Sequence, residues 1–365
     1  RPGHPPRHGG ARQGAAGVII VHEDAPASYG WTTVRNSWSG PNFDIVRSNA
    51  NERVPVESWL QRDVAVELFR RAGLDFDALK MQARSRDFQP VALTGATLDV
   101  TLDVASEQIV THNIIGRLRG TTRPDETILF TGHWDHIGVG APDAEGDAIF
   151  NGAVDNASGI AGLLELARIA TAGPRPERSL VFIGFTAEES GLLGSEYYAA
   201  NPLYPLETTV GGFNMDSANV YGRTQHLGVI GFGQSADFDA RLEAAASAQG
   251  RTIEPDQMTQ AGFYFRSDHF PLAKRGVPMV YADSSGPFVD EPIAARTAAR
   301  DEYTARRYHQ ANDEWSGDWD YRGQIQDLEL YWSIARDLAN GRDWPTWSET
   351  SEFATARAAS DGARD

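Results

Sequence analysis

The chain contains no cysteine among its 365 residues. It therefore has neither a disulfide framework nor a thiolate that could bind a metal ion. Any metal site must be built from His, Asp and Glu side chains. Such nitrogen and oxygen ligands favour zinc, with manganese or cobalt as alternatives.

Long apolar runs and clusters of basic residues are also missing. No stretch approaches the ~20 apolar residues of a membrane-spanning helix, so no membrane span is expected. The formal net charge of -17 argues against nucleic acid as a partner, because phosphate binding depends on patches of Lys and Arg. Hydrophobic residues make up 41% of the chain, which is enough for a sizeable core and predicts one large domain with a smaller one.

The N-terminal part predicts a short irregular segment and then a small α/β unit. Residues 1–14 lack an initiating Met and the apolar core of a signal peptide, so we expect them to be poorly ordered and the chain to be a fragment or a processed form. Residues 15–84 begin with a short buried strand, GVIIVHE. They continue through VPVESWLQRDVAVELFRRAGLD, in which Val64, Leu68 and Leu74, with the neighbouring Ala65 and Phe69, predict an amphipathic helix that ends near Gly73.

Residues 85–345 form the larger predicted domain. Apolar and polar residues alternate in two stretches of residues 91–120, which predicts antiparallel edge strands. Short apolar strands then alternate with helices, and this order predicts a mainly parallel sheet with helices on both faces. A final helix is expected over about residues 322–340, and residues 346–365 are expected to form a loosely held polar tail.

Five possible metal ligands occur in the larger predicted domain, with a further carboxylate beside the third: His133, Asp155, Glu189, Asp216 and His309, with Glu188 as the extra carboxylate. Three of these positions directly follow the short apolar runs ILFT, LVFIGF and GGFNM, which predict buried strands. Ligand groups in an open α/β sheet gather beyond the carboxyl ends of the strands, so these positions can converge on one site.

Each of these residues also has an ordinary interpretation. Asp155 and Asp216 could cap a helix or a turn, and His309 could be an exposed loop histidine. Adjacent carboxylates such as the Glu188-Glu189 pair repel each other unless a cation or a shared proton separates them, although a solvated acidic loop would also contain them. The joint occurrence of all five in this order favours a two-metal hydrolase.

An H-x-D motif adds a supporting residue to this set. His133 and Asp135 lie two residues apart at a predicted strand end, where their side chains face the same way. We therefore expect the Asp135 carboxylate to orient the His133 imidazole.

Six segments carry a resemblance to a known family: TGHWDHIG, FNGAVDNASGIAGLLELAR, FTAEESGLLGSEYY, NMDSANVYG, FRSDHFPLAKRGVPMVYAD and YHQANDEW. Together, over about residues 127–315, they resemble the di-zinc exopeptidases that include bacterial leucyl aminopeptidases, glutamate carboxypeptidase and the inactive transferrin receptor. The segment QGAAGVIIVHEDAPASYGW is similar to the protease-associated domain of some members. The resemblance implies a zinc-peptidase α/β fold and a periplasmic or secreted location. One departure is Ala311-Asn312, where the family usually has Pro-Ser.

The resemblance also implies the following arrangement of ligands around two zinc ions: His133 and Asp216 on one, Glu189 and His309 on the other, and Asp155 bridging both. It implies that Glu188 is the general base, which takes a proton from water and passes it to the leaving amine. Tyr308 would donate to the tetrahedral oxyanion. The bond between Asp155 and Asn156 would be cis.

Three functional classes stay open at this stage. An aminopeptidase, which would bind the ammonium group of a peptide substrate with site carboxylates, is favoured by the acidic chain. A carboxypeptidase or a glutamate carboxypeptidase-like hydrolase would need a cationic cluster, and the nearby candidates are Arg266, Lys274 and Arg275. An inactive receptor-like binding protein would be expected to have lost ligands. The sequence leaves the oligomeric state and the substrate side chain open.

Several other residues near the motifs are expected to have supporting roles. His136 and His269 occupy no ligand position of the family, so we expect them to be structural or to support a ligand. Asp268 and residues 263–266 are candidates for lining the substrate pocket.

Overall fold

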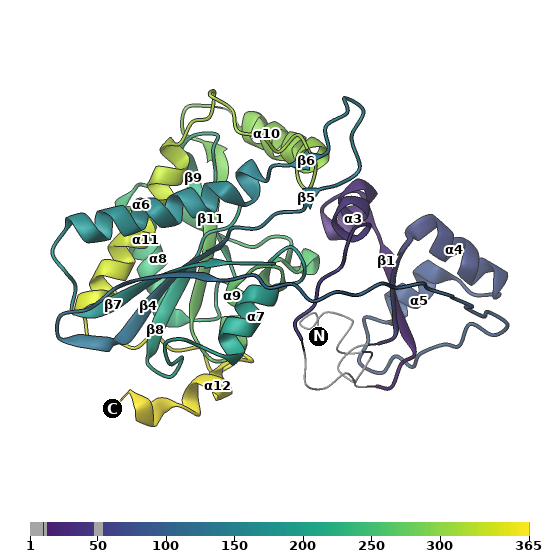
Figure 1. The fold of residues 1–365 in the computed structure, drawn as a ribbon, viewed down its shortest axis with the longest axis horizontal. Coiled ribbons are helices and arrows are strands. Elements are labelled where there is room, and N and C mark those ends of the chain that lie inside the picture. Colours follow the sequence, from purple (N-terminus) through teal and green to yellow (C-terminus); the bar gives the residue numbers. More distant parts are fainter. Residues whose placement is uncertain (1–9, 11–12, 47–53, 292, 365) are drawn as a thin grey trace. The chain divides into compact units, whose positions relative to one another are not determined.

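The computed structural model describes residues 10, 13–46, 54–291 and 293–364 of the protein. The chain divides into two compact units, Arg1–Val34 with Arg47–Val110 and Arg35–Val46 with Thr111–Asp365 (Figure 1). This division falls later than the boundary predicted at residue 85. Most of the predicted irregular segment, residues 1–14, lies outside the described residues.

The smaller unit contains a parallel strand pair with helices. Strand β1 (Gly17–His22) pairs with β2 (Val56–Gln61), and helices α4 (Arg62–Arg71) and α5 (Phe76–Gln82) follow. Two short helices, α2 (Asp24–Ala27) and α3 (Trp31–Trp38), come between the strands in sequence. The predicted amphipathic helix around Val64 and Leu68 is confirmed as α4. The β-branched and aromatic stretch before it, residues 56–61, is a strand that pairs with β1.

The larger unit is built on a seven-stranded sheet of order β10-β9-β11-β8-β4-β7-β3. Its strands are β3 (Ile114–Leu118), β4 (Arg123–His133), β7 (Arg178–Phe185), β8 (Thr209–Asn214), β9 (Thr224–Ile230), β10 (Thr252–Pro255) and β11 (Met279–Phe288). Four neighbouring pairs are parallel, and β3·β7 and β9·β11 are antiparallel, so the predicted mainly parallel sheet is confirmed. A separate pair joins β5 (Gly138–Val139) to β6 (Ile149–Phe150).

Helices of the larger unit follow the predicted alternation with the strands: α6 (Gly159–Ala172), α7 (Leu193–Ala200), α8 (Ala236–Ala248), α9 (His269–Lys274), α10 (Ile293–Arg306), α11 (Arg322–Asn340) and α12 (Ala354–Ala358). Shorter turns are η2 (Ala153–Ser158), η3 (Thr259–Ala261), η4 (Phe263–Phe265) and η5 (Asp361–Ala363). Helix α11 has the predicted bounds. Among the described residues, no helix is both long enough and apolar enough to cross a membrane.

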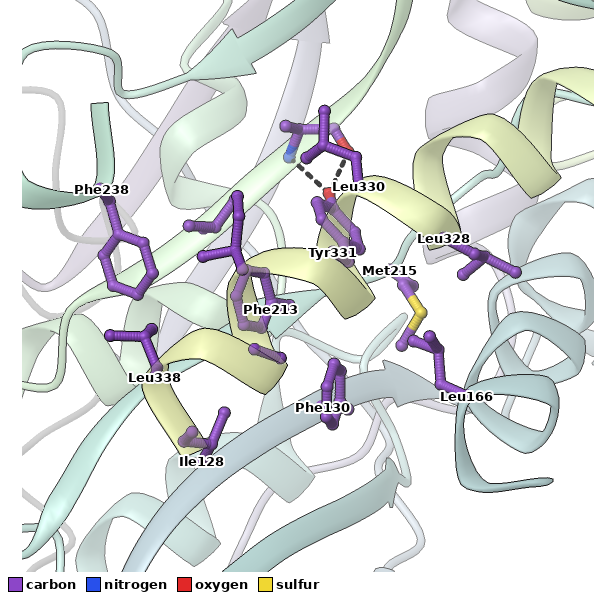
Figure 2. Close-up of a cluster of buried hydrophobic side chains, with 14 of the residues drawn as sticks. Ile128, Phe130, Leu166, Phe213, Met215, Phe238, Leu328, Leu330, Tyr331 and Leu338 are labelled. Atoms are coloured by element: carbon purple, nitrogen blue, oxygen red, sulfur yellow. Dashed lines mark hydrogen bonds between the residues drawn. The ribbon is translucent and has the colours of Figure 1, made fainter. Parts of the chain in front are cut away.

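The central strand β4 shows why helices cover both faces of the sheet. Ile128 and Phe130 point into one apolar cluster, which includes residues of α6, α8 and α11, whereas Leu129 points into a second cluster with α7 and α9. Successive side chains of a strand face opposite sides, so an uninterrupted apolar run needs a cover on each. Figure 2 shows the first cluster, in which Phe213 lies between Phe130 and Tyr331.

Two predicted segments differ from the structure. In residues 91–110 no strand forms, and their alternating apolar residues, such as Val104 and Val110, are exposed because no neighbouring strand pairs with them. The segment predicted as a loose polar tail is packed instead. Trp347 and Phe353 are buried against α9, and the buried Arg357 donates hydrogen bonds to backbone carbonyls that include that of Thr209 in β8.

Candidate metal centre

Three adjacent strands deliver most of the candidate ligands to one edge of the sheet. His133 is the last residue of β4, the Glu188-Glu189 pair follows β7, and Asp216 follows β8. These strands run parallel in the order β8-β4-β7, so their carboxyl ends meet. The structure therefore brings together the residues that the sequence placed after separate strands.

The bridging candidate Asp155 lies between two histidines. Nε2 of His133 is 3.2 Å from Asp155 Oδ1, and Nε2 of His309 is 3.3 Å from Asp155 Oδ2. On the outer sides, His133 Nε2 is 3.4 Å from Asp216 Oδ1, and His309 Nε2 is 3.1 Å from Glu189 Oε2. Each oxygen of Asp155 thus faces one imidazole, with a further carboxylate beyond each imidazole.

The buried carboxylates of this cluster need positive charge nearby to offset their own negative charge. Burial alone would lower the pKa of His133, but the carboxylate of Glu188 and its other acidic neighbours hold that pKa well above its ordinary value. Burial alone would raise the pKa of Asp155, but hydrogen bonds from His133 and His309 hold it well below. Protons on the imidazoles thus compensate the buried carboxylates here, and divalent cations would do so equally. Groups of these donors lie within 4.8 Å of one another, which fits a metal centre.

The loop that carries Asp155 is held by a residue that the sequence reasoning missed. The peptide bond between Asp155 and Asn156 is cis, as the family resemblance implied. The carboxylate of Asp313 accepts hydrogen bonds from the backbone N–H groups of Val154 and Asp155, at 3.0 Å to the nearer oxygen in each case. Asp313 follows His309 by four residues, so one short segment both supplies a candidate ligand and holds the loop of another. That fixed spacing is the signal that could have identified it.

Asp135 does not act as predicted. Nδ1 of His133 lies 3.1 Å from the backbone carbonyl oxygen of Asp135, whereas the Asp135 carboxylate is 3.9 Å away. That carboxylate instead accepts the backbone N–H groups of Glu188 and Glu189, at 3.0 and 3.3 Å. The main chain of Asp135 therefore orients the imidazole, while its side chain fixes the turn that presents the two glutamates.

A line of buried polar side chains supports Asp216. Ser267 donates to Asp216 Oδ2 at 2.5 Å, Asn214 donates to Ser267 at 2.7 Å, and Thr131 donates to Asn214 at 2.7 Å. Thr131 lies in β4, Asn214 lies in β8, and Ser267 lies two residues before α9. The neighbouring Asp268 is fully buried, and its burial raises its pKa to about 7.

His309 has an unusual backbone conformation and two contacts that fix its ring. Its φ is 56°, in the left-handed region that few non-glycine residues adopt. Ser37, which belongs to the same compact unit, places Oγ 2.7 Å from Nδ1 of His309, and this leaves Nε2 to face the carboxylates. The ring of Tyr308 lies beside that of His309, with 4.0 Å between ring centroids.

The fold and the cluster together define an α/β protein with a His, Asp and Glu centre at the carboxyl ends of adjacent parallel strands. A family model described as Peptidase family M28 matches residues 113–333, which is more than half of the chain. The chain belongs to this family.

Individual relatives match shorter parts of the chain. The chain is similar to a probable zinc metalloprotease of Pyrenophora tritici-repentis, with 45% identity over 86 residues, 24% of this chain and 19% of the relative. It is also similar to the mouse aminopeptidase NAALADL1, with 30% identity over 161 residues, 42% of this chain and 20% of the relative. The matches thus span about a fifth of these relatives' length.

Two solved structures are also similar to this chain. The zinc aminopeptidase BSAP from Bacillus subtilis has 22% identity and a TM-score of 0.47, over 66% of this chain and 52% of that chain. An aminopeptidase from Aneurinibacillus sp. strain AM-1 has 22% identity and a TM-score of 0.49, over 94% of this chain and 66% of that chain.

Proposed function

We propose that the protein is a metallo-aminopeptidase that binds two zinc ions and removes N-terminal residues from peptides. The observation that carries this proposal is the position of Asp155, whose two oxygens face His133 and His309 separately. A carboxylate placed in this way can bridge two cations. The remaining donors would complete the two sites: Asp216 beside His133, and Glu189 beside His309. Zinc is favoured by the donor types and by the names of the relatives.

Glu188 is the proposed general base. Its side chain is buried beside the cluster, and burial raises the pKa of Glu188 well above its ordinary value, with Asp216 and Glu189 raising it further. A base with a raised pKa accepts a proton from water near neutral pH and releases it again to the leaving amine. Metal ions, when bound, would acidify the attacking water and polarise the scissile carbonyl. Tyr308, beside His309, is the proposed donor to the oxyanion.

The charged residues around the site favour an amine over a carboxylate as the recognised end of the peptide. A carboxypeptidase needs an uncommitted cation for the terminal carboxylate of its substrate. Nζ of Lys274 already lies 2.6 Å from Glu196 Oε2, and the guanidinium of Arg266 lies over the ring of Phe263. The carboxylates of the cluster, by contrast, suit the ammonium group at the N-terminus of a peptide.

Substrate polarity provides the test of this proposal. The zinc-loaded protein is given the same aminoacyl substrates with a free and with an acetylated α-amino group. We expect hydrolysis of the free amines only, with loss of this activity after Glu188→Gln. Equal rates on free and acetylated substrates would contradict the aminopeptidase assignment. Turnover of substrates with a free C-terminal carboxylate alone would support a carboxypeptidase instead.

A further inference from the structure

A further histidine side chain reaches the centre, although nothing in the sequence assigned it to the metal. His136 lies three residues after the end of β4, and 7% of its side chain is exposed. Its Nδ1 is 2.6 Å from Oε1 of Glu189. Donor atoms of His136, Asp155 and Glu189 all lie within 4.8 Å of one another.

The contact between His136 and Glu189 lacks the geometry of a hydrogen bond. Among the residues that the structure describes, neither ring nitrogen of His136 has a hydrogen-bond partner, and neither has Oε1 of Glu189. All three atoms are closed to solvent. Buried polar atoms without partners are costly, at about 1–3 kcal/mol each. Two such atoms, placed side by side without an N–H directed at the oxygen, leave lone pairs that a bound cation would satisfy.

The surrounding backbone leaves room for this imidazole. Gly152 has a φ of 62°, and a Cβ added there would lie 2.5 Å from Cγ of His136. The loop that leads into Asp155 is therefore shaped around the His136 ring. On its other side the ring lies nearly perpendicular to that of His309, with an interplanar angle of 85° and 5.6 Å between centroids.

We propose that His136 is a metal ligand of this protein, and that its Nδ1 binds the same ion as Glu189, His309 and Asp155. This inference rests on the two-metal centre of the proposed function. It makes the two sites unequal, since one ion has four protein ligands and the other, beside His133, has three. The ion beside His136 is then the last to be removed by a chelator, and the ion beside His133 keeps more positions for water and substrate.

Two substitutions distinguish a ligand from a residue that only positions Glu189. His136→Ala removes the imidazole, whereas His136→Asn places an amide near the Nδ1 position. The amide can donate a hydrogen bond to Glu189, but its nitrogen does not bind zinc. Calorimetric titration of the metal-free proteins with Zn²⁺ should show that both variants weaken one of the two zinc sites, by more than the roughly 10–100-fold that loss of a residue supporting a ligand costs. The other site should change little. His112→Ala, at an exposed histidine, is the matched control.

The outcomes separate this inference from the proposed function. Recovery of zinc affinity in His136→Asn, or unchanged affinity in both variants, would overturn the role of His136 while leaving a two-metal centre intact. A wild-type protein that binds fewer than two zinc ions would overturn the two-metal centre and this inference with it. X-ray absorption of the zinc-loaded wild-type protein tests the proposal without a variant, because it gives the number of imidazole ligands. We expect three imidazoles in total on the two zinc ions. A total of two would contradict the proposal.

Discussion

The two neighbouring glutamates have different environments, which predict different effects of the same substitution. Glu189 faces His309 at 3.1 Å, whereas Glu188 is buried beside the cluster and its carboxylate raises the pKa of His133. Glu188→Gln should keep both zinc ions and lower kcat by about 10²–10⁴-fold, because the amide cannot accept the proton of water. Glu189→Gln should weaken one zinc site. Zinc analysis and steady-state kinetics on both variants check this, and loss of a zinc ion in Glu188→Gln alone would reverse the assignment.

Asp313 is expected to act through the loop that it holds. Its carboxylate accepts two backbone N–H groups at Val154 and Asp155, and removing it leaves them buried without partners. Asp313→Ala should therefore destabilise the protein by about 2–4 kcal/mol and weaken zinc binding, while Asp313→Asn, which keeps one acceptor oxygen, should lose less of both. Urea unfolding and zinc titration of the two variants measure these effects. Full zinc affinity in Asp313→Ala would contradict the positioning role.

His269 should make the stability of the folded protein fall as the pH is lowered. Burial lowers the pKa of His269 to about 3, so the imidazole stays neutral in the folded protein while the unfolded chain takes up a proton near pH 6.5. The stability that the neutral, buried His269 contributes is therefore fully present above about pH 6.5. It is lost as the pH falls toward 3. His269→Phe should remove up to about 1.4 kcal/mol of acid sensitivity per pH unit. Urea unfolding at pH 6, 5 and 4 tests this, and parallel curves for variant and wild type would refute it.

At the scale of single residues, the sequence predicted the candidate metal ligands better than the residues that hold those ligands in place. The five ligand candidates and Glu188 could be found because metal-binding side chains after apolar strands are a local pattern. Ser267 and His136 could not be assigned, because their contacts join segments far apart in sequence, and the only sign of Asp313 was its place four residues after His309. Asp135 was found, but only the folded turn shows that its carboxylate binds the backbone of the two glutamates rather than His133.

At the scale of elements, a buried hydroxyl of α11 forms hydrogen bonds to the sheet, beside those that Asp327 of the same helix accepts from Ser284 in β11. Tyr331 accepts the backbone N–H of Ala282 in β11 at 3.0 Å and donates to the carbonyl of the same residue (Figure 2). Tyr331→Phe keeps the ring in the core but leaves both backbone groups without this partner. We expect a loss of about 2–3 kcal/mol in the free energy of unfolding. Tyr197→Phe, on the exposed side of α7, is the control and should change it by less than about 0.5 kcal/mol.

Strands and helices with a strong apolar pattern were predicted well, and elements without one were not. The strands β4, β7 and β8 and the helix α11 combine clear periodicity with buried positions. Helix α10 has no buried residue, so no periodic apolar face marks it in the sequence. The alternation in residues 91–110 resembled that of a strand, but a strand requires a partner, and the sequence could not show that none is available there.

At the scale of the whole molecule, metal binding and folding should be coupled. The buried cluster holds several carboxylates within short distances, and ions that bind the folded state alone add stability by mass action. Removal of metal with a chelator should therefore lower the melting temperature, and excess Zn²⁺ should restore it. Thermal unfolding with elemental analysis measures both quantities. A melting temperature independent of zinc, in a protein that releases two ions, would show that the cluster needs no metal for stability.

Amino-acid composition predicted neither the boundary between the two units nor the packing of the C-terminal segment. Residues 346–365 are polar on average and were expected to be loosely held. Trp347 and Phe353 nevertheless pack into an apolar cluster of the larger unit, and Arg357 donates hydrogen bonds to its backbone. Such isolated anchors carry little weight in an average over twenty residues. The late boundary between the units depends likewise on contacts and not on a change in composition.

The order β8-β4-β7 has a consequence for how such a centre changes over evolution. Neighbouring strands are about 4.8 Å apart in any sheet, because backbone hydrogen bonds fix that separation whatever the side chains are. His133 ends one of three such strands, and Asp216 and Glu189 follow the other two within four residues, so the main chain sets much of their spacing. Insertions after β9 or before α10 leave that spacing unchanged. A lineage with this fold can therefore diversify other loops without altering the separation between these three side chains.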